Sequence, residues 1–437
     1  MPVEREGVTL SRRSLLGVAS GGAMLGVPGW LGNAPRQPGR GSLTFDTGTN
    51  RGPPTTDRSL LHDYDLLELN VAMEDSTADP DEIPAIDEPK FRTADDPTPA
   101  LDDGDPIFGV AMDGEAKAYP QRILVWHEIV NDEIGGRPIA VTYCPLTGTA
   151  QGFHRGNTRF GVTGRLLNSN LIAFDRASET PWSQMLALGL GEPNRGAYLD
   201  EFRVVWTTWQ RWRQTYPETF VLTQNTGYIR NYDRDPYGWY NPRGGYYDRD
   251  GTLYAPLATD DRLHEKAVVL GVRTADGPFA VRKESLRASG VVEGSVGGVP
   301  YAIVYDDELD TGRAYRNTAN ASIEADDSAV LVNGERYSAD SLPLDSVIAI
   351  DAMWFAWYGF FPSTVLLGKE NEHSLSVTAD SDDPTGAVDR FDAQQREVES
   401  ARQHAGPVNT EDIAKVIGAG GIGLGIGMAR LLRDEIE

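Results

Sequence analysis

Short runs of alternating hydrophobic and polar residues recur along the chain and predict β-strands. The runs PIFGVAM and EAKAYP alternate on either side of Asp113-Gly114, and residues 126–155 alternate on either side of Gly135-Gly136. Two-residue turns that contain glycine are typical of β-hairpins. Three more short runs, TAQGFHRG, RFGVTGRL and NLIAFDRA, follow. The pattern therefore predicts a mainly antiparallel sheet within residues 106–224.

The Gly135-Gly136 turn sets the register of its hairpin. Ile134 faces Arg137 and, if no bulge intervenes, the same pairing places His127 opposite Cys144 in a non-hydrogen-bonded pair. The Cβ atoms of such a pair lie about 4.5–5.5 Å apart. We therefore expect a thiol and an imidazole to be neighbours.

Helical spacing of hydrophobic residues occurs at three places in the same region. Pro120 begins a short helix that includes Trp126. The stretch TPWSQML and residues 205–216 also have helical spacing, and residues 205–216 carry Trp209 and Trp212 on one face. These positions predict short helices between the strands.

Residues 267–369 repeat the pattern of residues 106–224. Gly297-Gly298 follow Gly135-Gly136 by 162 positions, as Gly271 follows Gly109. Farther along, Trp354 and Trp357 follow Trp209 and Trp212 by 145 positions. Landmarks at fixed offsets indicate an internal repeat. The predicted fold class is α+β, mainly antiparallel β-sheet, with two tandem copies of one unit that each carry a packed, Trp-bearing helix.

The second copy lacks the reactive groups of the first. Asp306, Ser289 and Arg316 stand where the first copy has Cys144, His127 and His154. We therefore expect any chemistry to belong to residues 106–224 and the second copy to support them.

The segments outside the two copies differ in composition. Residues 1–34 contain Ser-Arg-Arg-Ser-Leu-Leu and then a Gly/Ala-rich apolar run, the pattern of a twin-arginine export signal. Residues 35–62 predict a disordered linker, and residues 63–105 predict an acidic, irregular lead-in. The expected location is extracellular or on the outer face of the cell membrane.

Two further segments leave alternatives open. Residues 225–266 are a Tyr/Asp-rich connector, a composition found in carbohydrate-binding surfaces and in loops packed on their own rings. Residues 370–412 predict an acidic flexible tail. The Gly-rich apolar segment 413–437 contains GxGxxG, but no strand–helix–strand unit follows, which excludes dinucleotide binding. Either this segment or the N-terminal signal would associate with a membrane. Alternatively, the segment is an oligomerising tail with a small-residue helix–helix face, or a marginally ordered tail.

Charge and cysteine content exclude several classes of function. The formal net charge is −25, and only 6 of the 40 basic residues are lysine. Nucleic-acid binding needs a basic surface and is excluded. An acidic, lysine-poor surface is typical of halophilic archaea. The single cysteine excludes an internal disulfide and a CxxC redox pair.

Several long motifs resemble one family. They are IPAIDEPKF, GEAKAYPQRILVWHEIVND, GGRPIAVTYCPLTGTA, FGVTGRLLNSNLIAFDR and WSQML. Together they resemble the uncharacterised family called domain of unknown function 3179, from about residue 83 to about residue 370. The family has no established activity. Some members look like selenoproteins, with selenocysteine three residues after the cysteine that matches Cys144, which implies redox chemistry in those members. Here that position is Thr147, so the resolving partner is missing.

Thiol-based redox chemistry is the first of three hypotheses. Cys144 would attack as a thiolate, His127 would lower its pKa, and Thr147 would donate a hydrogen bond to the sulfur. A thiol reductant of unknown identity would be needed from outside, because no second cysteine is present to resolve a sulfenate. Whether the protein is an enzyme is left open.

Metal binding is the second hypothesis, and a binding or structural module is the third. Cys144, His127 and His154 would supply one thiolate and two imidazoles, a set that suits copper. In the third hypothesis, polar side chains line a pocket. The candidate side chains are Arg165, Asn168, Asn170, Asp175, Trp182 and Gln184. The same residues would equally satisfy turns and a core tryptophan.

Overall fold

Antiparallel strands dominate the structure, and the predicted α+β class is confirmed at this level. The computed structural model describes residues 52–368 apart from residues 59, 61–62, 77 and 97–100. All of the described residues belong to one compact unit. The predicted export signal, most of the linker, the acidic tail and the Gly-rich C-terminal segment lie outside the described residues.

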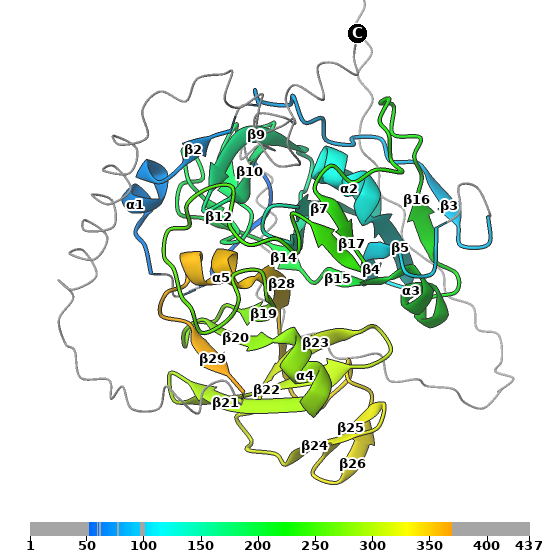
Figure 1. Cartoon of the computed structure of the whole chain (residues 1–437), viewed down its shortest axis with the longest axis vertical. Coiled ribbons are helices and arrows are strands. Elements are labelled where there is room, and N and C mark those ends of the chain that lie inside the picture. The colour runs from blue at the N-terminus through cyan, green and yellow to red at the C-terminus, as the bar shows by residue number, and fades with distance from the viewer. Residues whose placement is uncertain (1–51, 59, 61–62, 77, 97–100, 369–437) are drawn as a thin grey trace, which may run out of the picture. The chain divides into compact units, whose positions relative to one another are not determined.

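Three sheets form the first region, residues 52–224 (Figure 1). One has the order β15 (Val205–Thr208), β4 (Pro106–Met112), β5 (Glu115–Pro120), β16 (Phe220–Leu222) and β3 (Phe91–Thr93). The next has the order β14 (Glu201–Phe202), β8 (Thr149–His154), β7 (Arg137–Cys144) and β6 (Ile129–Ile134). The third has the order β1 (Thr55–Thr56), β13 (Tyr198–Leu199), β12 (Leu188–Gly189), β11 (Pro181–Ser183), β10 (Asn170–Asp175), β9 (Phe160–Leu167) and β2 (Glu74–Asp75).

The connector contributes one hairpin, and the second region contributes three sheets. The hairpin pairs β17 (Gly238–Tyr240) with β18 (Arg243–Gly245). The sheets of the second region, in strand order, are β28 (Ala349–Met353), β19 (Val268–Val272), β20 (Phe279–Arg282) and β29 (Val365–Leu367); β21 (Val291–Val296), β22 (Val299–Asp306), β23 (Thr311–Arg316) and β27 (Asp345–Val347); and β24 (Ile323–Asp326), β25 (Ala329–Val332) and β26 (Glu335–Tyr337).

Five short helices lie between these strands in the described part of the chain: α1 (Leu66–Val71), α2 (Gln121–His127), α3 (Trp209–Thr215), α4 (Lys283–Ser289) and α5 (Trp354–Phe360). Helix α1 has a capping box, because Asp65 accepts hydrogen bonds from the N–H groups of Leu67 and Glu68, and Glu68 accepts one from Asp65. No helix among the described residues is long and apolar enough to cross a membrane.

Corresponding elements of the two regions keep the offsets found in the sequence. Helix α4, strand β21, strand β22 and strand β23 begin and end 162 positions after α2, β6, β7 and β8. Helix α5 and strand β29 lie 145 positions after α3 and β16. The packing is also alike: Trp212 donates to Thr219 Oγ1 at 2.9 Å, and Trp357 donates to Thr364 Oγ1 at 2.9 Å.

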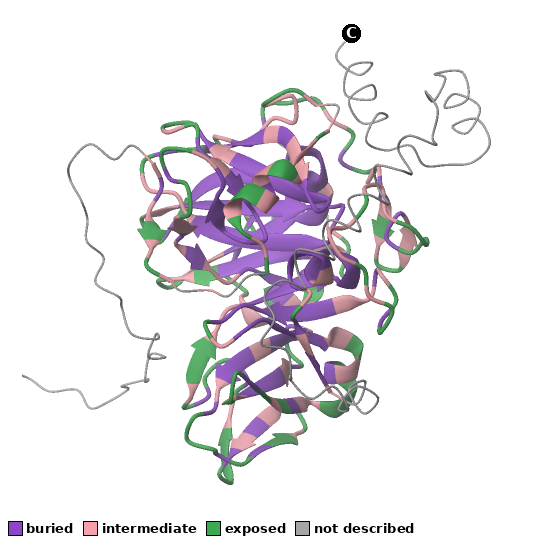
Figure 2. Cartoon of the chain, turned by 90° about the vertical axis from the view of Figure 1, so that its left-hand side faces the viewer, coloured by how far each residue is buried: buried purple, intermediate pink, exposed green. Residues whose placement is uncertain are grey.

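Two stretches that were predicted to be helical contain strands instead. Residues 205–208 form β15, which pairs with β4 over four residues, and the helix begins only at Trp209. Residues Pro181–Ser183 form β11 between β10 and β12. In both cases strand pairing decides the local structure over helical spacing, with the distant β4 for β15 and with the neighbouring β10 and β12 for β11. Figure 2 shows the central strands of the first region buried almost throughout.

Candidate functional site

Cys144 ends strand β7 in the interior of the first region. It lies opposite Thr149, is 1% exposed, and donates a weak hydrogen bond to Ser169 O at 3.5 Å. Burial raises the pKa of the thiol to about 11, and the Glu128 carboxylate adds to the rise. Hydrogen bonds from Thr147 act in the opposite direction without outweighing burial. The thiol is therefore protonated at neutral pH.

The predicted pairing of His127 with Cys144 is wrong. The hairpin keeps the predicted register only from Ile134 and Arg137 to Ile129 and Thr142, and His127 is the last residue of α2. Its ring nitrogens lie 2.7 Å from Pro84 O and 2.7 Å from Tyr232 Oη. Burial lowers the pKa of His127 to about 4, so the neutral ring holds two chain segments together.

Glu128, the residue after His127, is the charged group that acts on the Cys144 thiol, and it raises the thiol pKa where the sequence predicted that His127 would lower it. It ends α2 in the left-handed backbone region, with φ of 55°, and is 8% exposed. Burial raises the pKa of its carboxyl group to about 8. The residue 162 positions later is Gly290, with φ of 73°. A glycine there is a sequence signal for a left-handed residue at the end of the helix, and the prediction from sequence missed it. A buried glutamate with a left-handed backbone is strained and costly.

The proposed copper ligands do not meet. Strand pairing places Cys144 opposite Thr149 and His154 opposite Ile139, five residues along the same hairpin. At about 3.3 Å per residue, their backbones are about 17 Å apart, too far for one ion. Among the described residues, no three His, Cys, Asp or Glu side chains gather as a metal group.

Three of the predicted site residues, Thr147, Asn170 and Gln184, do come together in a buried polar cluster. Asn170 Nδ2 donates to Thr147 Oγ1 at 3.0 Å and to Gln184 Oε1 at 2.8 Å. Gln184 Nε2 donates to Thr142 Oγ1 at 2.8 Å and to Thr149 O at 3.2 Å. Cys144 borders this cluster through Ser169. The amide groups hold β10 and the turn after β11 against β7, β8 and the turn between them.

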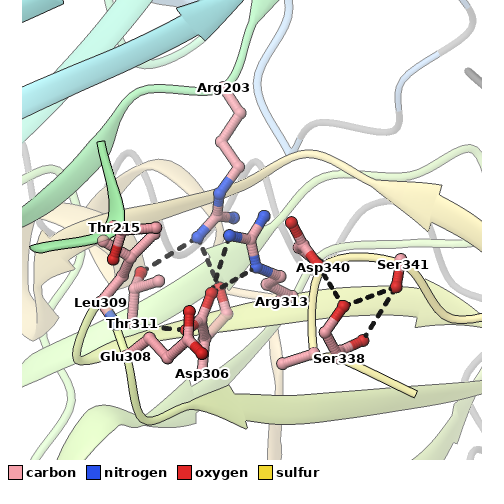
Figure 3. A network of polar contacts seen from close by, with 12 residues as sticks. Arg203, Thr215, Asp306, Glu308, Leu309, Thr311, Arg313, Ser338, Asp340 and Ser341 are labelled. Carbon is pink, nitrogen blue, oxygen red and sulfur yellow. Dashed lines mark hydrogen bonds and ion pairs between the residues drawn. The ribbon is translucent and has the colours of Figure 1, made fainter. Parts of the chain in front are cut away.

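Gln151 is the unsatisfied member of this cluster. It lies opposite Thr142, is 2% exposed, and neither its Nε2 nor its Oε1 has a hydrogen-bond partner among the described residues. The residue 162 positions later is Arg313, whose Nε donates to Asp306 Oδ2 at 2.7 Å. Asp306 lies 162 positions after Cys144. Figure 3 shows this ion pair, with Arg203 beside it.

The other predicted pocket residues lie elsewhere. Arg165 forms an exposed ion pair with Asp75 at 2.9 Å. Asp175 accepts from Trp182 Nε1 at 3.0 Å and stabilises its own turn. Asn168 binds across to the second region, because its Nδ2 donates to Ala356 O at 2.8 Å. Each of these side chains has its own structural partner, and they do not line a shared pocket.

A cleft of about 510 Å³ opens where the first region, the connector and the second region meet. Trp206 lines it from β15, Tyr240 and Arg243 from the connector hairpin, and Lys283 and Asp351 from the second region. The ring centroids of Trp206 and Tyr240 are 4.6 Å apart. Sequence reasoning missed this cleft, although the Tyr-rich composition of the connector had suggested a binding surface.

Three residues that line the cleft each carry a polar side-chain atom that is buried without a partner among the described residues. The atoms are Thr207 Oγ1, Tyr240 Oη and Arg243 Nε. The Tyr240 hydroxyl reaches the loop that follows Cys144, because a Cβ added at Gly148 would lie 2.7 Å from Tyr240 Oη. Glycine at position 148, with φ of 58°, allows this approach. The cleft and the Cys144 loop are thus in contact.

One family matches most of the chain. Its sequence pattern, described as Protein of unknown function (DUF3179), covers residues 80–364. The chain belongs to the DUF3179 family. The resemblance carried by the motifs is thereby confirmed. No curated protein and no solved structure matches the chain.

The DUF3179 match includes both sites described above. It contains the polar cluster of the first region, the connector, and the residues of the second region that line the cleft. The family supplies no activity, so function has to be argued from the two sites themselves.

Proposed function

We propose that this member of the DUF3179 family is a ligand-binding protein whose small polar ligand occupies the cleft. The supporting observation is that three residues lining the cleft, Thr207, Tyr240 and Arg243, each carry a buried polar atom without a partner among the described residues. Leaving a buried polar atom without a partner costs about 1–3 kcal/mol. A hydroxylated or charged ligand would satisfy these atoms, and the aromatic rings would cover its apolar faces. The volume of the cleft lies within the range of about 300–1,000 Å³ typical of small-molecule sites.

Thiol redox chemistry has less support than binding. The expected activating base, His127, bonds Pro84 and Tyr232, and burial raises the pKa of Cys144 to about 11. Reactive cysteines are partly exposed and have a lowered pKa. Copper binding has less support for a separate reason, because His154 is far from Cys144 along the hairpin.

We also propose that the two regions are tandem copies of one unit. The equal offsets of the helices and strands, and the matching Trp–Thr hydrogen bonds, support this. The first copy would then retain the thiol and the unpaired glutamine, while the second closes the same position with the Asp306–Arg313 ion pair. Binding in the cleft uses residues from both copies.

Export by the twin-arginine route and adaptation to high salt complete the proposal. The paired arginines Arg12-Arg13 support export, and the net charge of −25 supports a halophilic setting. Replacing both arginines by lysine would block twin-arginine transport and retain the full chain inside the cell. Fractionation of an archaeal host that expresses either form would show the difference. An equal distribution of both forms would contradict export by this route.

The binding proposal is tested by thermal unfolding of the full chain with a panel of sugars, amino acids, nucleotides and carboxylic acids. We expect at least one class to raise the melting temperature, because a ligand that binds only the folded state stabilises it. The shift should fall in Thr207→Val and Tyr240→Phe, which remove unpaired polar groups of the cleft. Tyr228→Phe, an exposed tyrosine outside the cleft, is the matched control. A shift equal in all four proteins, or none at all, would argue against the cleft.

A further inference from the structure

We infer that the ligand of this cleft carries an anionic group, a carboxylate or a phosphate, that is held by Arg243 and Lys266. This inference rests on the proposed binding function and names the chemistry of the ligand. Its basis is the distribution of paired and unpaired charges on the cleft walls.

Most charged side chains of the cleft already neutralise one another. Lys283 Nζ lies 2.7 Å from Asp351 Oδ1, and Arg287 makes two hydrogen bonds to Asp310, at 2.9 and 2.8 Å. Arg282 pairs with Glu284. A ligand that bound these groups would have to displace an existing carboxylate partner, so they offer little net attraction for an anion.

Arg243 differs because no carboxylate pairs with it among the described residues. Its Nη2 donates to two backbone carbonyls, Tyr247 O at 2.5 Å and Lys266 O at 2.9 Å. Its guanidinium carbon lies 5.5 Å from the centroid of the Tyr240 ring. The Nε–H remains a buried donor without an acceptor. A planar guanidinium fixed in this way and still charged is suited to an oxyanion.

Lys266 supplies a second cation, and its backbone carbonyl accepts a hydrogen bond from Arg243. Its Nζ donates to Tyr246 O at 2.7 Å and Arg249 O at 2.6 Å, and lies 3.9 Å from the centroid of the Tyr246 ring. An ammonium has three donors, so one is left. Glu265 and Asp250 act on Lys266 at a distance, but the structure contains no ion pair to it in its described part. Burial lowers the pKa of Lys266, which is the cost that a nearby anion would offset.

The other residues that line the cleft indicate the chemistry of the rest of the ligand. Trp206, Tyr240 and Tyr247 contribute aromatic rings to the lining, and Thr207 Oγ1 and Tyr240 Oη are buried hydroxyl groups without a partner among the described residues. One acidic residue of the lining, Asp248, stands without an ion pair, and it is exposed to solvent. In a chain of net charge −25, two unmatched cations in one cleft are a local exception. An acidic sugar, or another hydroxylated ring of that size with one anionic group, combines these features.

The probes are glucuronate, glucose 6-phosphate and glucose, titrated into the full chain by isothermal calorimetry. We expect both acidic sugars to bind at least tenfold more tightly than glucose. Arg243→Gln and Lys266→Met should each reduce the affinity for the acids at least tenfold and leave that for glucose nearly unchanged. Arg234→Gln, which changes the charge equally at an exposed connector residue outside the cleft, should have no effect. Circular dichroism checks that each variant is folded.

A salt series in the wild-type protein keeps the test independent of the variants. Affinity for the acids should fall as potassium chloride rises, while that for glucose stays constant, because screening acts on charge. Equal affinity for glucose and the acids would overturn the anionic ligand and leave binding in the cleft intact. Binding of none of the three overturns the acidic-sugar inference, and only an unresponsive panel in the thermal assay would remove the binding function as well.

Discussion

Cys144 and Asp306 occupy the same position in two sheets: each ends an inner strand and lies opposite a threonine, Thr149 or Thr311. Two residues farther along the neighbouring strand are Gln151 and Arg313. The acid and the arginine satisfy one another, whereas the thiol and the amide do not. The same framework therefore has one closed polar position and one with an unpaired amide.

The closed position predicts strong energetic coupling between Asp306 and Arg313. Removing one member of a buried ion pair leaves the other uncompensated and costs about 3–5 kcal/mol. We expect Asp306→Ala to be the worse change, because it leaves the guanidinium groups of Arg203 and Arg313 together (Figure 3). Burial and the charge of Arg313 already lower the pKa of Arg203 to about 10. Chemical denaturation of both single variants and the double variant measures the coupling.

An exposed ion pair of the same region is the control for this double-mutant cycle. Arg336 and Asp326 pair at the surface, where such contacts contribute about 1 kcal/mol or less. Their coupling should therefore be much smaller. Equal coupling in the two cycles would show that the Asp306–Arg313 pair is not energetically buried.

The thiol of Cys144 should react slowly in the native protein. With a pKa of about 11, roughly one thiol in a thousand is ionised at pH 8, and the side chain is 1% exposed. Iodoacetamide labelling followed by mass spectrometry should be far slower than for a free thiol, and denaturant should remove the protection. Rapid native labelling would restore the thiol hypothesis.

The sequence predicts local pairing well and distant pairing poorly. The Gly135-Gly136 turn sets the register from Ile134 to Ile129, because each pair follows from its neighbour. The prediction is wrong beyond that point because helix α2 continues to His127, and Glu128 then adopts a left-handed backbone that a glutamate does not signal. Strand β15 was mistaken for helix because its pairing with β4 joins segments about a hundred residues apart.

The prediction of the candidate site was also limited to residues that lie close together in sequence. Asn170, Gln184 and Thr147 were predicted because their motifs lie close together in sequence, and they do meet. The cleft is built from three distant segments, and no sequence spacing places Trp206 beside Tyr240. Its unpaired atoms are visible only once those segments are in place.

Two glycines should be equally intolerant of a side chain. A Cβ at Gly109 would lie 2.2 Å from the Trp212 ring, and one at Gly271 would lie 2.2 Å from the Trp357 ring. Overpacking of this kind costs about 1–3 kcal/mol. Gly109→Ala and Gly271→Ala should therefore lower the melting temperature by similar amounts. Gly104→Ala is the control, because its backbone, like theirs, is outside the left-handed region and only the end of the Asn241 side chain, at 3.2 Å, lies near its added Cβ. A loss no greater than that control would mean that the tryptophans move aside.

Glu128 should make stability fall as the pH rises. Its pKa is raised by burial from 4.5 to about 8 in the folded protein, so the folded state binds more protons than the unfolded state between these values. Stability from this group is therefore complete below about pH 4.5 and is lost as the pH approaches 8, at up to about 1.4 kcal/mol per pH unit. The loss should be on the order of a few kcal/mol.

Glu128→Gln removes the titration, and Glu128→Gly also removes the backbone strain by introducing the residue found at Gly290. Denaturant unfolding between pH 5 and pH 9 should show a shallower pH dependence in both variants, and Glu128→Gly should be more stable than the wild type at pH 8. Glu133→Gln, at an exposed position of β6, should keep the wild-type slope. Parallel pH profiles for Glu128→Gln and the wild type would mean that the carboxyl group is ionised in the folded protein and reaches solvent.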